Sequence, residues 1–223
     1  MAKATRPIFV PLDRFPFVRA VPITFDWYAG FAKTQVQKCI AALHQAAVQH
    51  GIESVLEISS KSKQPLGISL SAFNLMLTTK HAVRMSVENA FQGSKVFVDG
   101  GPYVDLYTVS SREAKTDQRL RTSGNLRAFQ FIGEDFPIRP LTAFYDWLYI
   151  TALAQHPDLA EQLFTFKGFS DIVFNPHKSL NCQARAAALF VALHRTGTLA
   201  DVVANKAHYL NLITHSIPEE SEQ

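Results

Sequence analysis

The chain has 223 residues, of which 47% are hydrophobic and 18% are charged, a composition that indicates a folded globular protein and excludes a disordered one. The N-terminal segment lacks the apolar core of a secretory signal, and no segment approaches the roughly 18 consecutive apolar residues of a membrane span, so we expect a cytoplasmic protein. Its net charge of +3 is too small by itself to indicate nucleic-acid binding.

The N-terminal quarter predicts an extended arm, a helix and a strand. Residues 1–25 contain several prolines and are expected to form the arm. In residues 33–50, apolar side chains recur at helical spacing and Gly51 follows, which is typical of a helix and its end. Residues 54–59 alternate like a strand.

The rest of the chain predicts mainly helices. Residues 84–97 suit a helix with Ser86 as its N-cap, and residues 125–138 suit a β-hairpin. Residues 171–174 are expected to form a short strand. Three further segments have helical patterns: residues 143–154 after Thr142, the segment that begins at Pro157, and residues 179–195. We therefore expect one α+β domain over residues 1–223, predominantly helical with a few short strands and a frayed tail at 217–223.

The common catalytic signatures are absent from the sequence. It contains no P-loop, GxGxxG, GxSxG, HExxH or CxxC motif. Its eight histidines are scattered without ligand spacing, and the same holds for Cys39 and Cys182. We expect no disulfide, no bound metal and no cofactor.

Residues 86–95 carry the first candidate site. At about 100° per residue, Glu88, Gln92 and Lys95 fall within roughly 60° of one another on a helix, so a carboxylate, an amide and an ammonium share one stripe. This pattern suits acid–base chemistry, but it also fits an ordinary solvated helix face.

Two other segments suit ligand binding. Residues 66–75 combine turn-forming residues with Phe73, which can present an aromatic face to a base or belong to the core. Residues 174–185 form a polar loop that enters a helix, where Lys178 and Arg185 suit a diphosphate near the helix N-terminus. Routine capping by Ser179 explains the same loop.

Residues 112–127 concentrate positive charge. Two acidic residues, Glu113 and Asp117, stand against five basic ones: Arg112, Lys115, Arg119, Arg121 and Arg127. We expect the first four of these to bind DNA. The alternatives are a solvated surface or, for Arg112 and Lys115, the wall of a diphosphate pocket.

Together, the segments at residues 66–75, 86–95 and 174–185 resemble the NADAR superfamily, which has a YbiA-like fold. Its members show a Phe-Ser-Asn-Phe-like loop, a Glu-His-Tyr-Phe-Gln-Ala-Gln-Lys-like helix and a late Gly/Asn-rich loop. The counterparts here are SAFN at residues 71–74, ENAFQGSK at 88–95 and residues 175–181. The helix keeps Glu, Phe, Gln and Lys in register but has Asn89 and Ala90 where His and Tyr are usual, and the late loop lacks the Trp-Gly-x-Gly pattern.

Residues 56–192 are similar to the NADAR branch found beside DarT-type DNA ADP-ribosyltransferase toxins. The similarity rests on LSAFNL, AFQGSKVF, GGPYVDLY, TAFYDWLYI and NPHKSLNCQAR. It implies an antitoxin that hydrolyses the bond between ADP-ribose and guanine in DNA, with ADP-ribosylated DNA, ADP-ribose and a DarT-type toxin as partners. A metabolic N-glycosidase on phosphorylated ribosyl intermediates, or a non-catalytic module that binds ADP-ribose or sequesters a toxin, are the alternatives.

The resemblance also implies roles for individual residues. Glu88 would stabilise an oxocarbenium-like sugar and orient water, Lys95 would give a proton to the leaving base, and Gln92 would hold water or a ribose hydroxyl. The expected substrate-binding residues are Phe73, Asn74, Trp147, Asp171, Lys178, Asn181 and Arg185. Among these, Phe73 and Trp147 would stack on bases.

Overall fold

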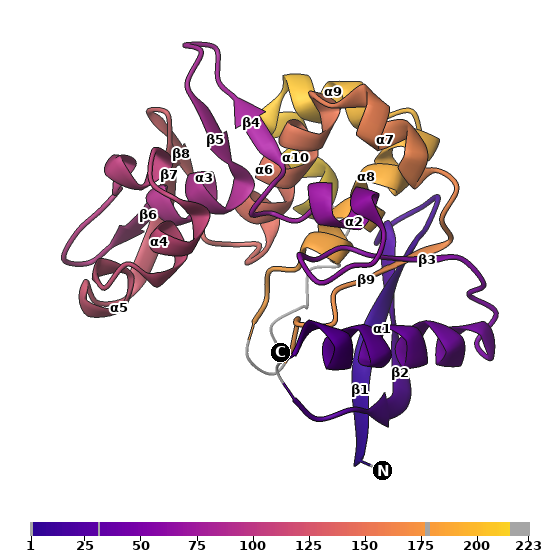
Figure 1. Ribbon diagram of the computed structural model, residues 1–223. Helices are drawn as coiled ribbons and strands as arrows, with labels where there is room; N and C mark the ends of the chain where they lie inside the picture. Colours follow the sequence, from indigo (N-terminus) through magenta and orange to yellow (C-terminus); the bar gives the residue numbers. More distant parts are fainter. Residues whose placement is uncertain (1, 31, 177–178, 215–223) are drawn as a thin grey trace, which may run out of the picture.

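The computed structural model describes residues 2–30, 32–176 and 179–214, and Figure 1 shows the arrangement of its helices and strands. Helix accounts for 42% and strand for 21% of these described residues. The expected α+β class is confirmed, although helix makes up less than half of the protein. The expected frayed tail at 217–223 lies outside the described residues.

A four-stranded sheet has the order β2-β1-β9-β3. Strands β1 (Ala2–Pro11) and β2 (Val18–Trp27) pair along their whole length as an antiparallel hairpin, where the sequence suggested an extended arm. Pairing is favoured because apolar side chains on both strands are buried: Ile8, Phe9, Ile23 and Phe25. The short strands β3 (Val55–Glu57) and β9 (Gly168–Ser170) run parallel to each other.

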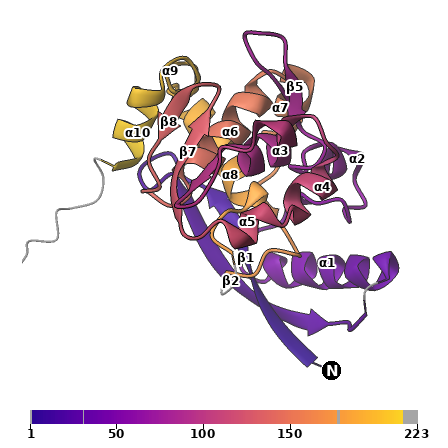
Figure 2. The same ribbon diagram turned by 90° about the vertical axis from the view of Figure 1, so that its left-hand side faces the viewer.

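Helices cover both faces of this sheet. Helix α1 (Lys33–Val48) confirms the predicted helix, and its buried Ile40 and Leu43 pack in one core cluster with Ile8 and Ile23 of the hairpin. Figures 1 and 2 show α1 beside the hairpin and apart from the helices of residues 143–214, which lie together in the upper part of both views. Successive residues of β1 therefore point into two cores, Ile8 toward α1 and Phe9 toward the larger cluster.

The larger core is built on helix α6. Helices α6 and α8 pack against each other, and nine of the twelve residues of α6 are buried. The bounds of the helices in this layer are α6 (Ala143–Ala154), α7 (Pro157–Leu163), α8 (Gln183–Arg195), α9 (Leu199–Ala204) and α10 (Lys206–Thr214). Helix α8 begins at Gln183 with Cys182 as N-cap, so the start predicted at residue 179 is wrong.

The predicted strand at residues 171–174 is also wrong, since β9 ends at Ser170. Asp171 Oδ1 accepts hydrogen bonds from the backbone N–H groups of Val173 (3.0 Å) and Phe174 (3.3 Å). An aspartate that satisfies the following backbone in this way forms a turn and ends the strand. Residues 171–176 and 179–182 therefore stay in loops.

A second sheet, with the order β6-β7-β8 and β6 at Lys95–Phe97, forms the lobe at the left of Figure 1. The hairpin predicted over residues 125–138 is confirmed as β7 (Leu126–Phe131) and β8 (Glu134–Phe136). Shorter elements accompany it: α2 (Pro65–Ser69), β4 (Met76–Thr78), β5 (Arg84–Ser86), the 3-10 helix η1 (Val104–Tyr107), α4 (Ser111–Thr116) and α5 (Arg119–Thr122).

The helix predicted over residues 84–97 is shorter than expected. Ser86 is the N-cap, as predicted, and its hydroxyl accepts from the backbone N–H of Asn89, but α3 (Val87–Gly93) has only seven residues. A side chain on Gly93 would approach the Tyr107 ring to 2.5 Å, so the packing here requires glycine. Lys95 then belongs to strand β6 (Lys95–Phe97), paired with β7, and the expectation that it continues the helix stripe is wrong.

Candidate active site

A cleft of about 1170 Å³ lies between the second sheet and the loops that follow β3 and β9. Helix α3 and strand β6 contribute one wall, and residues 59–61, 171–176 and 179–181 contribute the other. Three lysines and two carboxylates line the cleft: Lys61, Lys95, Lys115, Glu88 and Asp171. The cleft therefore offers separate positive and negative groups to a ligand.

Glu88, Gln92 and Lys95 form a continuous hydrogen-bonded row in this cleft. Gln92 Nε2 donates to Glu88 Oε1 at 2.9 Å, and Lys95 Nζ donates to Gln92 Oε1 at 2.7 Å. Glu88 is only 5% exposed. The three side chains expected to act together are thus brought together, although Lys95 arrives from a strand and not from the helix.

Burial lowers the pKa of Lys95 to about 8, from an ordinary value of 10.5. The charge of Glu88 opposes this decrease, and the charge of Lys115 adds to it. The Lys95 ammonium also lies 4.7 Å from the centre of the Phe91 ring. A lysine with this pKa can transfer a proton near neutral pH.

Lys115 belongs to the cleft. From α4, its ammonium lies 3.8 Å from Glu88 Oε1 and 4.9 Å from the centre of the Phe73 ring. We expected Lys115 on a surface that binds DNA, whereas the fold places it beside the carboxylate of the candidate site. Phe73 also lines the cleft, as expected for a residue that stacks on a base.

Asp171 and Ser59 face the cleft from the wall opposite α3. Each follows the carboxyl end of one of the two parallel strands, β9 and β3. Gln183 Nε2 donates to Asp171 Oδ2 at 3.0 Å. Burial raises the pKa of Asp171 to about 6, and the hydrogen bonds that it accepts limit this increase.

Glu57 is a buried carboxylate directly behind this wall, and the sequence reasoning missed it. It accepts hydrogen bonds from Ser59 Oγ at 2.8 Å, from Ser170 Oγ at 2.6 Å and from the backbone N–H of Ile172 at 2.9 Å. Burial above all, with the charge of Asp171, raises the pKa of Glu57 to about 8. The sequence signal for Glu57 was a charged residue placed between the apolar residues Leu56 and Ile58.

His44 supports the same group from helix α1. Its Nε2 lies 2.8 Å from Ser170 Oγ. Burial lowers the pKa of His44 to about 4, so the ring is neutral near pH 7.

Gln183 holds three segments of the cleft together. Its Nε2 donates to the Ile58 carbonyl at 2.7 Å and to Asp171, and its Oε1 accepts from the backbone N–H of Ala72 at 2.7 Å. The loops after β3, after β9 and before β4 are therefore linked by one amide. Sequence periodicity carried no sign of this role, because the partners lie far along the chain.

The structure places several expected binding residues away from the cleft. Trp147 packs against Phe131 and Phe136, with ring centres 6.4 and 4.9 Å apart. Arg185 forms an ion pair with the buried Asp146, and Asn74 Nδ2 donates to the Ile68 carbonyl. None of the three lines the cleft, so stacking by Trp147 and diphosphate binding by Arg185 are not supported. Asn181 does line it, and Lys178 lies outside the described residues.

The basic segment does not form one uniform surface. Arg119 bonds to Asp105 at 2.6 Å and to Asp117 at 2.9 Å, so its charge is largely compensated. It also lies 4.5 Å from the centre of the Tyr103 ring. Arg112 and Arg121 are exposed on α4 and α5.

Within residues 2–30, 32–176 and 179–214, no three or more His, Cys, Asp or Glu side chains are grouped so that they could hold a metal ion. In the same part of the chain, no helix has both the length and the apolar character needed to cross a membrane.

Comparison with known proteins identifies the family. A family model described as DarT1-associated NADAR antitoxin matches residues 4–223, which is nearly the whole chain. A comparison with curated proteins finds no match. The match includes the loop at residues 71–74, helix α3 and the loop before α8, the segments on which the resemblance rests. The chain therefore belongs to the family of DarT1-associated NADAR antitoxins.

Proposed function

We propose that this antitoxin is an N-glycosidase that releases ADP-ribose from a guanine base in DNA. The observation that carries the proposal is the row Lys95, Gln92, Glu88 in a cleft of about 1170 Å³. One amide holds an ammonium and a carboxylate at its two ends. Cleavage of an N-glycosidic bond needs both kinds of group, a proton donor for the base and a negative charge beside the sugar.

Glu88 is the group that stabilises positive charge on the sugar. When the bond to the base breaks, the anomeric carbon becomes oxocarbenium-like, and a nearby carboxylate lowers the energy of that state. The low exposure of Glu88 strengthens the interaction, because little water screens it. The same carboxylate orients the attacking water.

Lys95 is the group that gives a proton to the leaving base. With a pKa of about 8, about nine-tenths of the ammonium is protonated at pH 7, and it gives up its proton more readily than an ordinary lysine. Gln92 uses both ends of its amide to orient the other two side chains. Its main role is therefore positioning, where the sequence suggested contact with water or a ribose hydroxyl.

The remaining cleft residues suit the rest of the substrate. The Phe73 ring can stack on a base, a contact worth about 1–3 kcal/mol in nucleic-acid sites. Lys61, which the sequence reasoning did not single out, lines the cleft and suits a diphosphate. Arg112 and Arg121 remain the candidates for contact with the DNA backbone, since Arg119 is paired and Lys115 is in the cleft.

The test is release of free ADP-ribose from an oligonucleotide that carries ADP-ribosylated guanine, measured by mass spectrometry with the purified chain. We expect release by the native chain and loss of release in Lys95→Met. A double variant, Arg112→Ala with Arg121→Ala, should lose activity on the oligonucleotide but keep it on an ADP-ribosylated nucleoside. If the native chain binds the oligonucleotide but leaves the modification intact, the proposed hydrolysis is wrong.

A further inference from the structure

The floor of the cleft contains polar groups that lack partners. Within the described part of the chain, Ser71 Oγ and Asn181 Oδ1 are buried and make no hydrogen bond, and both residues line the cleft. Buried polar atoms are nearly always paired, because an unpaired one costs about 1–3 kcal/mol. Because both residues line the cleft, a ligand there can supply the missing hydrogen bonds.

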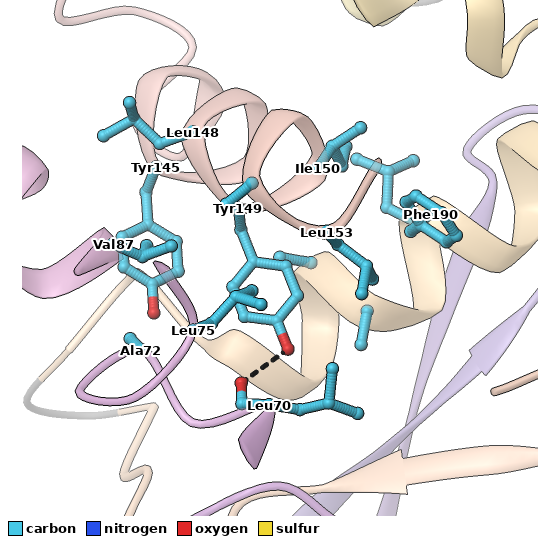
Figure 3. Close-up of a cluster of buried hydrophobic side chains, with 14 of the residues drawn as sticks. Leu70, Ala72, Leu75, Val87, Tyr145, Leu148, Tyr149, Ile150, Leu153 and Phe190 are labelled. Atoms are coloured by element: carbon cyan, nitrogen blue, oxygen red, sulfur yellow. Dashed lines mark hydrogen bonds between the residues drawn. The ribbon is translucent and has the colours of Figure 1, made fainter. Parts of the chain in front are cut away.

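Tyr145 adds a third such group. Figure 3 shows that Tyr145 and Tyr149 project from the same side of α6, with the Tyr149 hydroxyl bonded to the Leu70 carbonyl at 2.8 Å. The Tyr145 hydroxyl points toward Ala72 and has no such bond among the residues drawn in Figure 3. Tyr145 is 6% exposed and lines the cleft, so its hydroxyl is available to a ligand there.

These groups share the cleft with its two carboxylates, Glu88 and Asp171. The Tyr145 ring packs edge-on against Phe91, next to the row that contains Glu88. The Gln183 amide hydrogen-bonds both to Ala72, the neighbour of Ser71, and to Asp171. Asn181 lies two residues before Gln183 in the chain. Burial, with the charges of Glu88 and Asp171, raises the pKa of Tyr145, which keeps its hydroxyl protonated and able to donate.

The charge of this floor decides what it can bind. Two hydroxyls and an amide are neutral, and the neighbouring carboxylates repel a phosphate. A sugar hydroxyl both donates and accepts, so it can donate to Asp171 or Asn181 and accept from Tyr145. Two adjacent sugar hydroxyls use several of these groups at once.

We infer that Ser71, Tyr145 and Asn181, together with Asp171, form a subsite for the vicinal diol of a ribose. The inference rests on the proposed function, because it places the sugar whose bond is cut on the floor beside Glu88. It makes the 2- and 3-hydroxyls of that ribose determinants of specificity.

The test measures binding of ADP-ribose and of two analogues that lack the 2-hydroxyl or the 3-hydroxyl of the terminal ribose, by calorimetry. The wild-type chain should bind ADP-ribose more tightly than at least one analogue, by about three- to tenfold, the usual scale for one neutral hydrogen bond. Ser71→Ala and Tyr145→Phe should each lower the affinity for ADP-ribose by a similar factor. Each variant should weaken much less the binding of the analogue that lacks the hydroxyl contacted by the removed group, because that contact is already missing.

Tyr149→Phe is the matched control, since it removes the same atom from the same helix outside the cleft. It should leave the Leu70 carbonyl unpaired and lower the melting temperature without changing the preference for the diol. Ser71→Ala should not lower the melting temperature, because its hydroxyl has no partner to lose in the described part of the chain. A folded Ser71→Ala protein therefore keeps the test valid even if Tyr145→Phe is unstable.

The two proposals fail in different ways. Equal affinity of the wild-type chain for ADP-ribose and both analogues, or unchanged ADP-ribose binding in both cleft variants, would overturn the subsite. Failure to bind ADP-ribose would overturn it as well. Discrimination among the three ligands without release of ADP-ribose from the oligonucleotide would support the subsite and contradict the hydrolysis.

Discussion

Replacing Glu88 by glutamine tests the proposed chemistry most directly. The substitution keeps the shape of the side chain and leaves a side-chain oxygen to accept from the Gln92 amide, which donates to Glu88 Oε1 at 2.9 Å. The ion pair that it removes joins Glu88 to Lys115, whose side chain is 55% exposed, and exposed pairs contribute about 0–1 kcal/mol. We therefore expect the free energy of unfolding to change by less than about 1 kcal/mol.

The expected loss of rate is much larger. Two unit charges about 4 Å apart interact by about 4 kcal/mol at an effective dielectric constant of about 20. Losing most of this interaction in the transition state corresponds to at least about a hundredfold in rate, or about 2.7 kcal/mol. The pKa of Lys95 should also fall, because the charge of Glu88 favours its protonated form.

The assay is single-turnover release of ADP-ribose, with circular dichroism as the check on folding. Glu53→Gln is the matched control, because Glu53 is exposed and its ion pair with Lys167, at 3.3 Å, lies outside the cleft. Near-wild-type turnover in a folded Glu88→Gln protein would remove Glu88 from the chemistry. A loss of rate in Glu53→Gln as large as in Glu88→Gln would show that the effect is not specific to the cleft.

Three other predictions concern the groups around this row. The rate should fall above about pH 8 as Lys95 loses its proton. Lys115→Ala should move this decrease to higher pH, because the variant removes a positive charge that lowers the pKa of Lys95. An unchanged pH–rate profile would contradict the role of Lys95 as proton donor. Burial holds the pKa of Glu57 near 8 in the folded chain against an ordinary 4.5, so the folded state binds the extra proton and the free energy of unfolding should decrease from pH 6.5 to 8. Between pH 6.5 and 8, His44, with a pKa lowered to about 4 from 6.5, contributes a smaller change of opposite sign, because the unfolded imidazole is still half protonated at pH 6.5. Urea unfolding should therefore show the decrease in wild type and not in Glu57→Gln. Gln183→Leu should lower both the melting temperature and the affinity for ADP-ribose, because three segments of the cleft lose one link; unchanged affinity in a folded variant would exclude a positioning role.

The sequence by itself determined the features that depend on neighbouring residues. The spacing of apolar residues located α1 and the hairpin β7–β8, and Ser86 was recognised as an N-cap. Glu88 and Gln92 are four residues apart on α3, so their contact follows from helix geometry alone. The family was also recognisable, because its motifs are short and local.

Only the tertiary structure decided which distant residues meet. Helix α3 ends at Gly93, pairing of β6 with β7 places Lys95 on a strand, and α4 brings Lys115 to within 3.8 Å of Glu88. Parallel pairing of β3 with β9 brings Glu57 next to Asp171, which is more than a hundred residues away in sequence. Such contacts depend on how strands and helices pack, and no periodicity within a segment encodes its partner. For that reason the sequence indicated single residues on both walls, such as Glu88 and Asp171, while only the fold showed how the walls face each other and that Ser71 and Tyr145 lie among them.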